Sequence, residues 1–217
     1  MSKKIFKKIA LTLSLFLSIL TLNSFQVKAA IQSTNTVNNE LSVNDINFLS
    51  TKGNIENALS KLNNVALTQK DFNTKVRSIK LTDNLILEEE LTSIEVPNNT
   101  LTRATQVSRQ VTSKVNIKNN IGLTVTVLTA IGYFNHNGST SAAYDADYAV
   151  SSSAFYSSSG YVSYIGTSPV QGYARISCRY YVKGSLGFEW GNVTISELNI
   201  LANVFCNQNG DYYSQWN

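Results

Sequence analysis

The sequence predicts an all-β domain at residues 100–217, an antiparallel β-sandwich or small barrel of about seven or eight strands. Three observations support this prediction. Apolar and polar residues alternate with a period of two through most of the segment, which is typical of strands with one buried and one wet face. Asn-Gly pairs at 137–138 and 209–210 separate these runs and favour tight hairpin turns. All 11 tyrosines lie after residue 100, where charged residues are sparse.

The strands of this domain are predicted in chain order from the alternating runs. The first two strands are weakly patterned, the third is rich in tyrosine and alanine, and the last two alternate most regularly. They are expected at residues 111–117, 123–127, 144–150, 174–182 and 198–206.

Residues 1–29 have the order of charges and apolar residues that is typical of a secretory signal peptide. Lysines come first, an apolar run follows, and Val27-Lys28-Ala29 supplies a cleavage site before Ala30. The apolar run is about 14 residues long, and a membrane-spanning helix needs about 20. We therefore expect a cleaved Sec-type signal and a secreted protein, extracellular or associated with the cell wall. The lysine-rich start and asparagine-rich body are typical of proteins secreted by Gram-positive bacteria.

The net charge of +4 and the isoelectric point near 9.0 suggest a polyanionic partner only at first sight. Five of the 18 basic residues and none of the 14 acidic residues lie in residues 1–29. The remaining chain carries 13 basic and 14 acidic residues, a net charge of −1. Nucleic acid is therefore not an expected partner.

Two further regions precede the β domain. Residues 30–44 have no aromatic and few large apolar residues and are predicted to be a flexible lead. Residues 45–99 are predicted to be a helical or mixed region. Apolar spacing there favours two helices and two short strands, at 54–67, 72–79, 85–87 and 91–96. Whether residues 30–99 are a propeptide is left open.

The two cysteines, Cys178 and Cys206, both fall on the apolar face of a predicted strand. In an exported protein such a pair is most simply a disulfide bond, and we expect one here.

No catalytic constellation emerges, so we expect a protein that is not an enzyme and needs no cofactor. The single histidine, His136, adjoins a hairpin turn and is expected to be solvated. Asp145 and Asp147 share a strand face and are interpreted as solvated carboxylates. A carboxylate pair for acid–base chemistry or a weak Ca²⁺ site remains an alternative. The run Glu88–Glu90 is interpreted as a solvated charge run.

The remaining candidate is a surface for binding. Alternate residues of one strand form a predicted outward row of aromatic and basic side chains: Tyr173, Arg175, Arg179, Tyr181 and Lys183. Aromatic rings stack on sugars and arginine binds acidic groups. Trp190 is a further candidate ligand-binding residue. We therefore expect a secreted, non-catalytic binding protein of the cell envelope or extracellular space. Its ligand would be a polysaccharide, a wall polymer or a partner protein.

An alternative is a membrane-active protein that forms a β-pore or acts like a bacteriocin, masked by its N-terminal region. Residues 122–134 and 144–166 alternate, are rich in Ser, Thr and Tyr, and are nearly free of charge, as are strands that line a membrane barrel. Membrane contact is expected only under this alternative. Strand order, ligand identity and oligomeric state are not predicted.

Overall fold

The computed structural model describes residues 41–51, 53–96, 106–122, 124–152, 156–188 and 191–217, with the backbone alone for 185–188 and 191–195. Residues 44–217 form one compact unit, which consists mainly of β-strands. The prediction of an antiparallel all-β fold is therefore confirmed. The predicted signal peptide, most of the predicted flexible lead and Trp190 lie outside the described residues.

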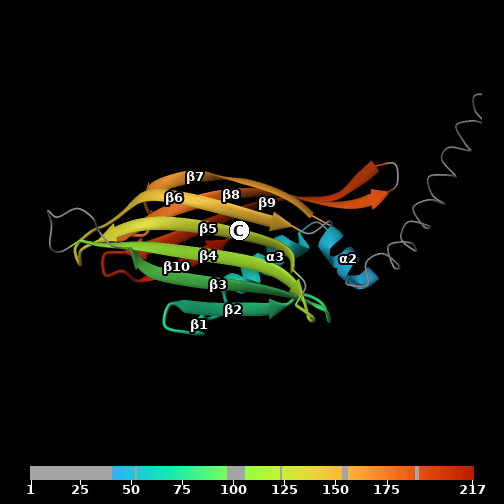
Figure 1. The fold of residues 1–217 in the computed structure, drawn as a ribbon, viewed down its shortest axis with the longest axis horizontal. Coiled ribbons are helices and arrows are strands. Elements are labelled where there is room, and N and C mark those ends of the chain that lie inside the picture. The colour runs from blue at the N-terminus through green and yellow to red at the C-terminus, as the bar shows by residue number, and fades with distance from the viewer. Residues whose placement is uncertain (1–40, 52, 97–105, 123, 153–155, 189–190) are drawn as a thin grey trace, which may run out of the picture. The chain divides into compact units, whose positions relative to one another are not determined.

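The strands form two antiparallel sheets, drawn in Figure 1. The six-stranded sheet has the order β1-β2-β3-β4-β5-β6, and the four-stranded sheet has the order β10-β9-β8-β7. In chain order the strands are β1 (Thr68–Gln69), β2 (Thr74–Lys80), β3 (Leu85–Val96), β4 (Val107–Asn119), β5 (Thr124–His136), β6 (Ser141–Ser152), β7 (Tyr156–Thr167), β8 (Tyr173–Phe188), β9 (Gly191–Asn207) and β10 (Tyr212–Trp216). Because β3 pairs with β4, residues on both sides of position 100 share one sheet.

Among the described residues, two helices precede the strands, α2 (Val43–Ser50) and α3 (Asn54–Asn63). The helix predicted over 54–67 is found but ends at Asn63. Ile55, Leu59 and Leu62 of its predicted stripe are buried, whereas Ala66 lies beyond the helix and is exposed. Helix α3 contacts both β2 and β10, one strand from each sheet. It therefore covers one open side of the core between the two sheets. No helix of the described residues is long and apolar enough to cross a bilayer.

The predicted second helix at 72–79 is wrong, because this segment forms β2. Val76 and Ile79 fit a helical spacing, yet β2 pairs with β3 along its whole length. Phe72, the third residue of the supposed apolar stripe, lies in the turn before β2 and is 96 % exposed. Pairing with a long neighbouring strand overrides a weak periodic signal of only two turns.

The core lies between the two sheets, and the alternation seen in the sequence supplies it. Even-numbered residues of β8 and β9 point inward, toward odd-numbered residues of β3 and β4. The buried side chains include Leu85, Leu87, Leu91, Val111, Val115 and Ile117 on one side and Ile176, Tyr180, Val182, Ile200, Ala202 and Val204 on the other. Each large apolar side chain buried in this way contributes about 1.5–3 kcal/mol relative to exposure.

The predicted disulfide bond is wrong, because both cysteines are free and buried. The register of β8 and β9 places Cys178 opposite Ala202 and Cys206 opposite Ala174. That offset of four residues separates the two cysteines by about 13 Å along the strands. A disulfide needs Cα atoms about 4.4–6.8 Å apart. Burial raises the pKa of each thiol to about 11.

The prediction of a solvated Glu88–Glu90 run fails at its middle residue, because Glu89 has no exposed surface. It lies on the inward face of β3 and is paired with Arg77 of β2, whose Nε donates to Glu89 Oε2 at 2.6 Å. The other carboxylate oxygen accepts hydrogen bonds from three buried side chains: Ser113 Oγ at 2.6 Å, Trp216 Nε1 at 3.1 Å, and Ser214 Oγ. We call these residues the Glu89 cluster. Both oxygens of the carboxylate accept hydrogen bonds, as a buried charge requires.

Asn63, at the end of α3, extends the Glu89 cluster to the helix. Arg77 Nη1 donates to the Asn63 carbonyl at 3.0 Å. The Asn63 side chain donates to the Trp216 carbonyl at 2.6 Å and accepts from the Trp216 amide at 3.1 Å. The cluster therefore ties the C-terminal strand to the helix and to the six-stranded sheet.

Candidate binding surface

The outward face of the four-stranded sheet carries the row predicted from β8. The inward residues Ala174, Ile176, Cys178, Tyr180 and Val182 are all buried. Tyr173 and Arg175 are half-buried, and Arg179, Tyr181 and Lys183 are exposed. Because side chains alternate along a strand, these five residues share the solvent side of β8. We call this solvent side of β7–β10 the outer face.

Strand β7 adds two tyrosines to the outer face that the sequence reasoning missed. The Tyr161 ring stacks on the Tyr181 ring with centroids 6.2 Å apart. The Arg175 guanidinium lies 4.5 Å from the centre of the Tyr164 ring. The register of β7 and β8 shifts between Val162 and Tyr164, so a β-bulge allows two tyrosines three residues apart to point the same way. A strict period of two could not reveal that.

These tyrosines are available to a ligand. Tyr161, Tyr164 and Tyr181 are 42 %, 37 % and 46 % exposed. A hydrogen bond with Tyr181 raises the pKa of Tyr161. Arg179 lies directly across from Tyr161 in the β7–β8 register. This half of the outer face therefore offers aromatic rings beside a cationic side chain.

The other half of the outer face is closed by contacts among its own rings. Tyr213 of β10 stacks on Phe205 with centroids 4.4 Å apart, and Tyr173 meets the Tyr213 ring edge-on at 5.3 Å. Burial raises the pKa of Tyr213. Ser177 and Asn203, at the centre of the face, are hydrogen-bonded to each other at 2.7 Å. Packing against these rings occupies Tyr173, whereas Arg175 and Tyr181 remain accessible to a ligand at the edges of this closed half.

Lys183 is at one end of the row. Among the described residues, it is the only basic residue of the row that forms an ion pair, to Glu197 at 3.1 Å. Both partners are more than half exposed, so this pair contributes little to stability. Arg175 and Arg179 leave the outer face with a positive balance. Such a balance attracts acidic groups.

His136 is not solvated as predicted, because it is only 8 % exposed at the end of β5. Its ring lies against Gly210, where an added Cβ would come within 2.7 Å of it, and Gly210 has a φ of 86°. Burial, and then the charge of Arg109, lower the pKa of His136. Among the described residues, Nε2 of the His136 ring is buried without a hydrogen-bond partner.

Asp145 and Asp147 are exposed on β6, and each carboxylate accepts the backbone amide of the next residue, at 2.8 and 2.7 Å. Within the described part of the chain, no three side chains of the His, Cys, Asp and Glu types gather as metal ligands would. The acid–base and Ca²⁺ interpretations of this pair remain predictions. The Ca²⁺ interpretation has no third ligand among the described residues.

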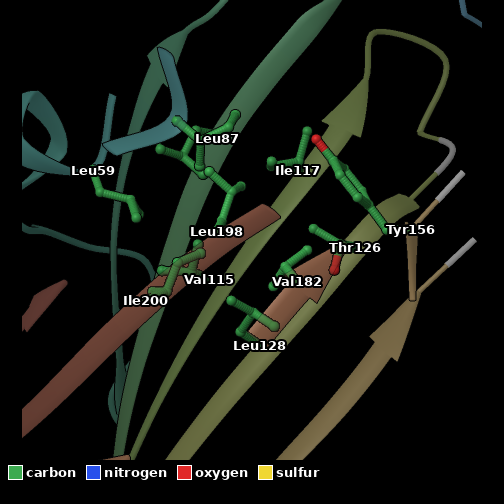
Figure 2. A pocket seen from close by; sticks show the side chains of 11 residues that line it. Leu59, Leu87, Val115, Ile117, Thr126, Leu128, Tyr156, Val182, Leu198 and Ile200 are labelled. Carbon is green, nitrogen blue, oxygen red and sulfur yellow. The ribbon is translucent and has the colours of Figure 1, made fainter. Parts of the chain in front are cut away.

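Figure 2 shows a small cavity in the core between the sheets. Leu87, Val115 and Leu128 of the six-stranded sheet line it, opposite Val182 and Ile200 of the four-stranded sheet. Its volume is about 10 Å³, far below the roughly 300–1,000 Å³ of ligand pockets. This cavity is a packing gap at the centre of an apolar core.

Comparisons of the chain with protein-family models, with curated proteins and with solved structures return no match. The functional interpretation therefore depends on the residues of this chain alone.

Proposed function

We propose that this protein is a secreted, non-catalytic binding protein whose outer face binds an extracellular polysaccharide that bears acidic groups, such as a wall polymer. The observation that carries the proposal is the exposed half of the outer face, where Tyr161 and Tyr181 stack beside Arg179 and Tyr164 lies against Arg175. We further infer that the two sheets form a sandwich rather than a closed barrel, since each sheet has two edge strands.

The chemistry of the exposed half suits a polymer of sugars. Aromatic rings held by stacking lose little side-chain freedom when a sugar ring packs on them. Arginine gives carboxylate or phosphate groups two parallel hydrogen bonds, which adds orientation to the charge attraction. An extended face with several weak contacts gains affinity when one polymer engages them together.

Export is part of the proposal and is supported by the signal-like residues 1–29. Free buried thiols do not oppose export, because burial and not pairing protects them.

The proposal is tested by retention of the full chain on immobilised acidic polysaccharide, for example polygalacturonate, against a neutral glucan. The variant Arg175→Ala plus Arg179→Ala should lose most retention, and so should Tyr161→Ala plus Tyr181→Ala. Lys61→Ala plus Lys80→Ala is the matched control, since it removes the same charge from exposed positions elsewhere. If the control and the outer-face variants lose retention equally, attraction is by net charge and the proposed site is wrong.

Pore formation remains a second candidate, favoured by the position of β6 and β7. Each is an edge strand of a different sheet and is hydrogen-bonded on one side only. Asp145 and Asp147 are the only charged side chains of these two strands. A pair of nearly uncharged edge strands, adjacent in the chain, is suited to leave its sheets as a hairpin.

Dye release from liposomes tests this candidate. Anionic and zwitterionic vesicles that stay intact at all protein concentrations would remove it. Release that disappears when an engineered disulfide holds β6 to β5, or β7 to β8, would support it over the polysaccharide proposal.

A further inference from the structure

A surface pocket of about 490 Å³ lies away from the exposed half of the outer face. The end of β3, the beginning of β4, the first residue of β10 and the turn before β2 surround it. Its lining includes Phe72, Asn73, Ser93, Glu95, Arg109 and Tyr212, and we call it the Arg109 pocket. The volume falls within the range of roughly 300–1,000 Å³ that is usual for small-molecule sites.

A fixed guanidinium group provides the polar side of the Arg109 pocket. Arg109 Nη1 donates to Ser93 Oγ at 3.0 Å, and Nη2 donates to Glu95 Oε1 at 3.1 Å. Ser93 is only 4 % exposed, so a buried side chain holds the Nη1 end of the Arg109 guanidinium. The Glu95 side chain is 69 % exposed and the Arg109 side chain 20 %. Donors and acceptors are thus set side by side and still reach solvent.

Two aromatic rings provide the apolar side. Phe72 is 96 % exposed at the tip of its turn, where Asp71 Oδ1 accepts the Asn73 amide at 3.0 Å. That hydrogen bond lowers the pKa of Asp71. Tyr212 is partly buried, with Lys75 Nζ 4.6 Å from the centre of its ring. The exposed ring of Phe72 is available to an apolar face of a ligand.

The charges of the pocket decide the class of ligand. Glu95 repels a free anion, and Arg109 with Lys75 repels a cation. A neutral molecule with many hydroxyl groups meets neither penalty and can donate to Glu95 and accept from Arg109. Its C–H faces can pack on Phe72, as apolar groups do in most ligand sites.

We propose that the Arg109 pocket binds a single neutral sugar residue, a ligand class that rests on the proposed polysaccharide function. The pocket adjoins the outer face through β10. Tyr212 pairs with Cys206 on the inward side, and the next residue, Tyr213, pairs with Phe205 on the outward side. A polysaccharide on the outer face therefore has a second subsite, for a neutral sugar, beside β10.

The test uses the full chain and free glucose, galactose and N-acetylglucosamine, each observed by saturation-transfer NMR. At least one sugar should receive saturation. Phe72→Ala should weaken its binding about tenfold, equivalent to the roughly 1.4 kcal/mol of one lost ring contact. Glu95→Gln should weaken it as well, because the acceptor loses its charge. Both positions are exposed, so both variants should fold, which a thermal melt checks.

The Arg175→Ala plus Arg179→Ala variant separates this proposal from the proposed function, since a free sugar is too short to span both sites. It should bind the free sugar like the wild type while losing polymer retention. If this variant binds the free sugar and its polymer retention is unchanged, only the proposed function of the outer face is wrong. The pocket proposal is overturned if none of the three sugars receives saturation, or if Phe72→Ala and Glu95→Gln bind as the wild type does. Displacement of the sugar by sodium acetate would also overturn it, by identifying an anion site.

Discussion

The Glu89 cluster and the outer face of the four-stranded sheet use the same residue types, arginine, serine and aromatic rings, in opposite ways. In the cluster, both oxygens of the Glu89 carboxylate accept hydrogen bonds from donors of the chain, and the Trp216 ring has no exposed surface. On the outer face, Tyr161 and Tyr181 contact each other and remain more than 40 % exposed. The first arrangement is complete in itself, whereas the second leaves groups that a ligand can use. Saturation of contacts, and not residue type, separates a structural polar cluster from a candidate site.

The largest expected effect concerns the closed region. Glu89→Ala leaves the Arg77 guanidinium buried without its carboxylate and should lower the free energy of unfolding by about 3–5 kcal/mol. The neighbouring Glu88→Ala is the control, since Glu88 is part-exposed and pairs with Lys118. It should cost about 0–1 kcal/mol. Urea denaturation measures both. Equal losses would mean that Glu89 is solvated like its neighbour.

The two buried thiols provide a second test of the difference between the closed core and the exposed outer face. Their pKa of about 11, raised from 9.0 by burial, lowers the thiolate fraction at neutral pH about a hundredfold. Iodoacetamide should therefore leave Cys178 and Cys206 unmodified in the folded protein, and modify both in urea without any reductant. Intact mass before and after urea measures this. Modification that requires a reductant would show a disulfide after all.

A smaller effect is expected from His136, at the margin of the closed region. Because burial lowers its pKa below 6.5, the unfolded chain binds this proton more readily than the folded chain. Its contribution to stability is complete above pH 6.5 and is lost as the pH falls from 6.5 through the lower folded pKa. The difference in unfolding free energy between the wild type and His136→Gln should be constant above pH 6.5 and should fall below it. A difference independent of pH would show that His136 is solvated.

The smallest expected effect on stability belongs to the outer face. Arg175→Ala plus Arg179→Ala removes exposed or half-buried side chains whose contacts lie at the surface. Its unfolding free energy should change by about 0.5 kcal/mol per site or less. A loss comparable to that of Glu89→Ala would place these arginines with the structural residues.

The sequence predicted those elements whose pattern repeats over many residues. Strands β8 and β9 alternate over nine residues each, at 174–182 and 198–206, and the helix predicted from residue 54 buries three of the four residues of its expected stripe. The prediction for 72–79 was wrong because its three apolar residues fit a helical spacing over only two turns, while pairing of β2 with β3 decides the structure. The prediction that Glu89 is solvated was wrong because it was made from charge alone. The partners of Glu89 come from β2, β4 and β10, which are distant from it in the chain.

The sequence predicted only part of the candidate site, for similar reasons. Alternation placed Arg175, Arg179 and Tyr181 on one face of β8. Tyr161 and Tyr164 were missed because a bulge breaks the period in β7, and a bulge has no signal in one sequence. The disulfide was predicted from face and compartment alone, and strand register, which decided against it, is a property of the paired strands.

The measurement that tests the central claim most directly combines stability and binding on one variant. Arg175→Ala plus Arg179→Ala is compared with the wild type for urea unfolding and for retention on immobilised polygalacturonate. The account predicts an unchanged unfolding transition together with loss of most retention. A destabilised protein whose retention, measured while it is still folded, equals that of the wild type would contradict it.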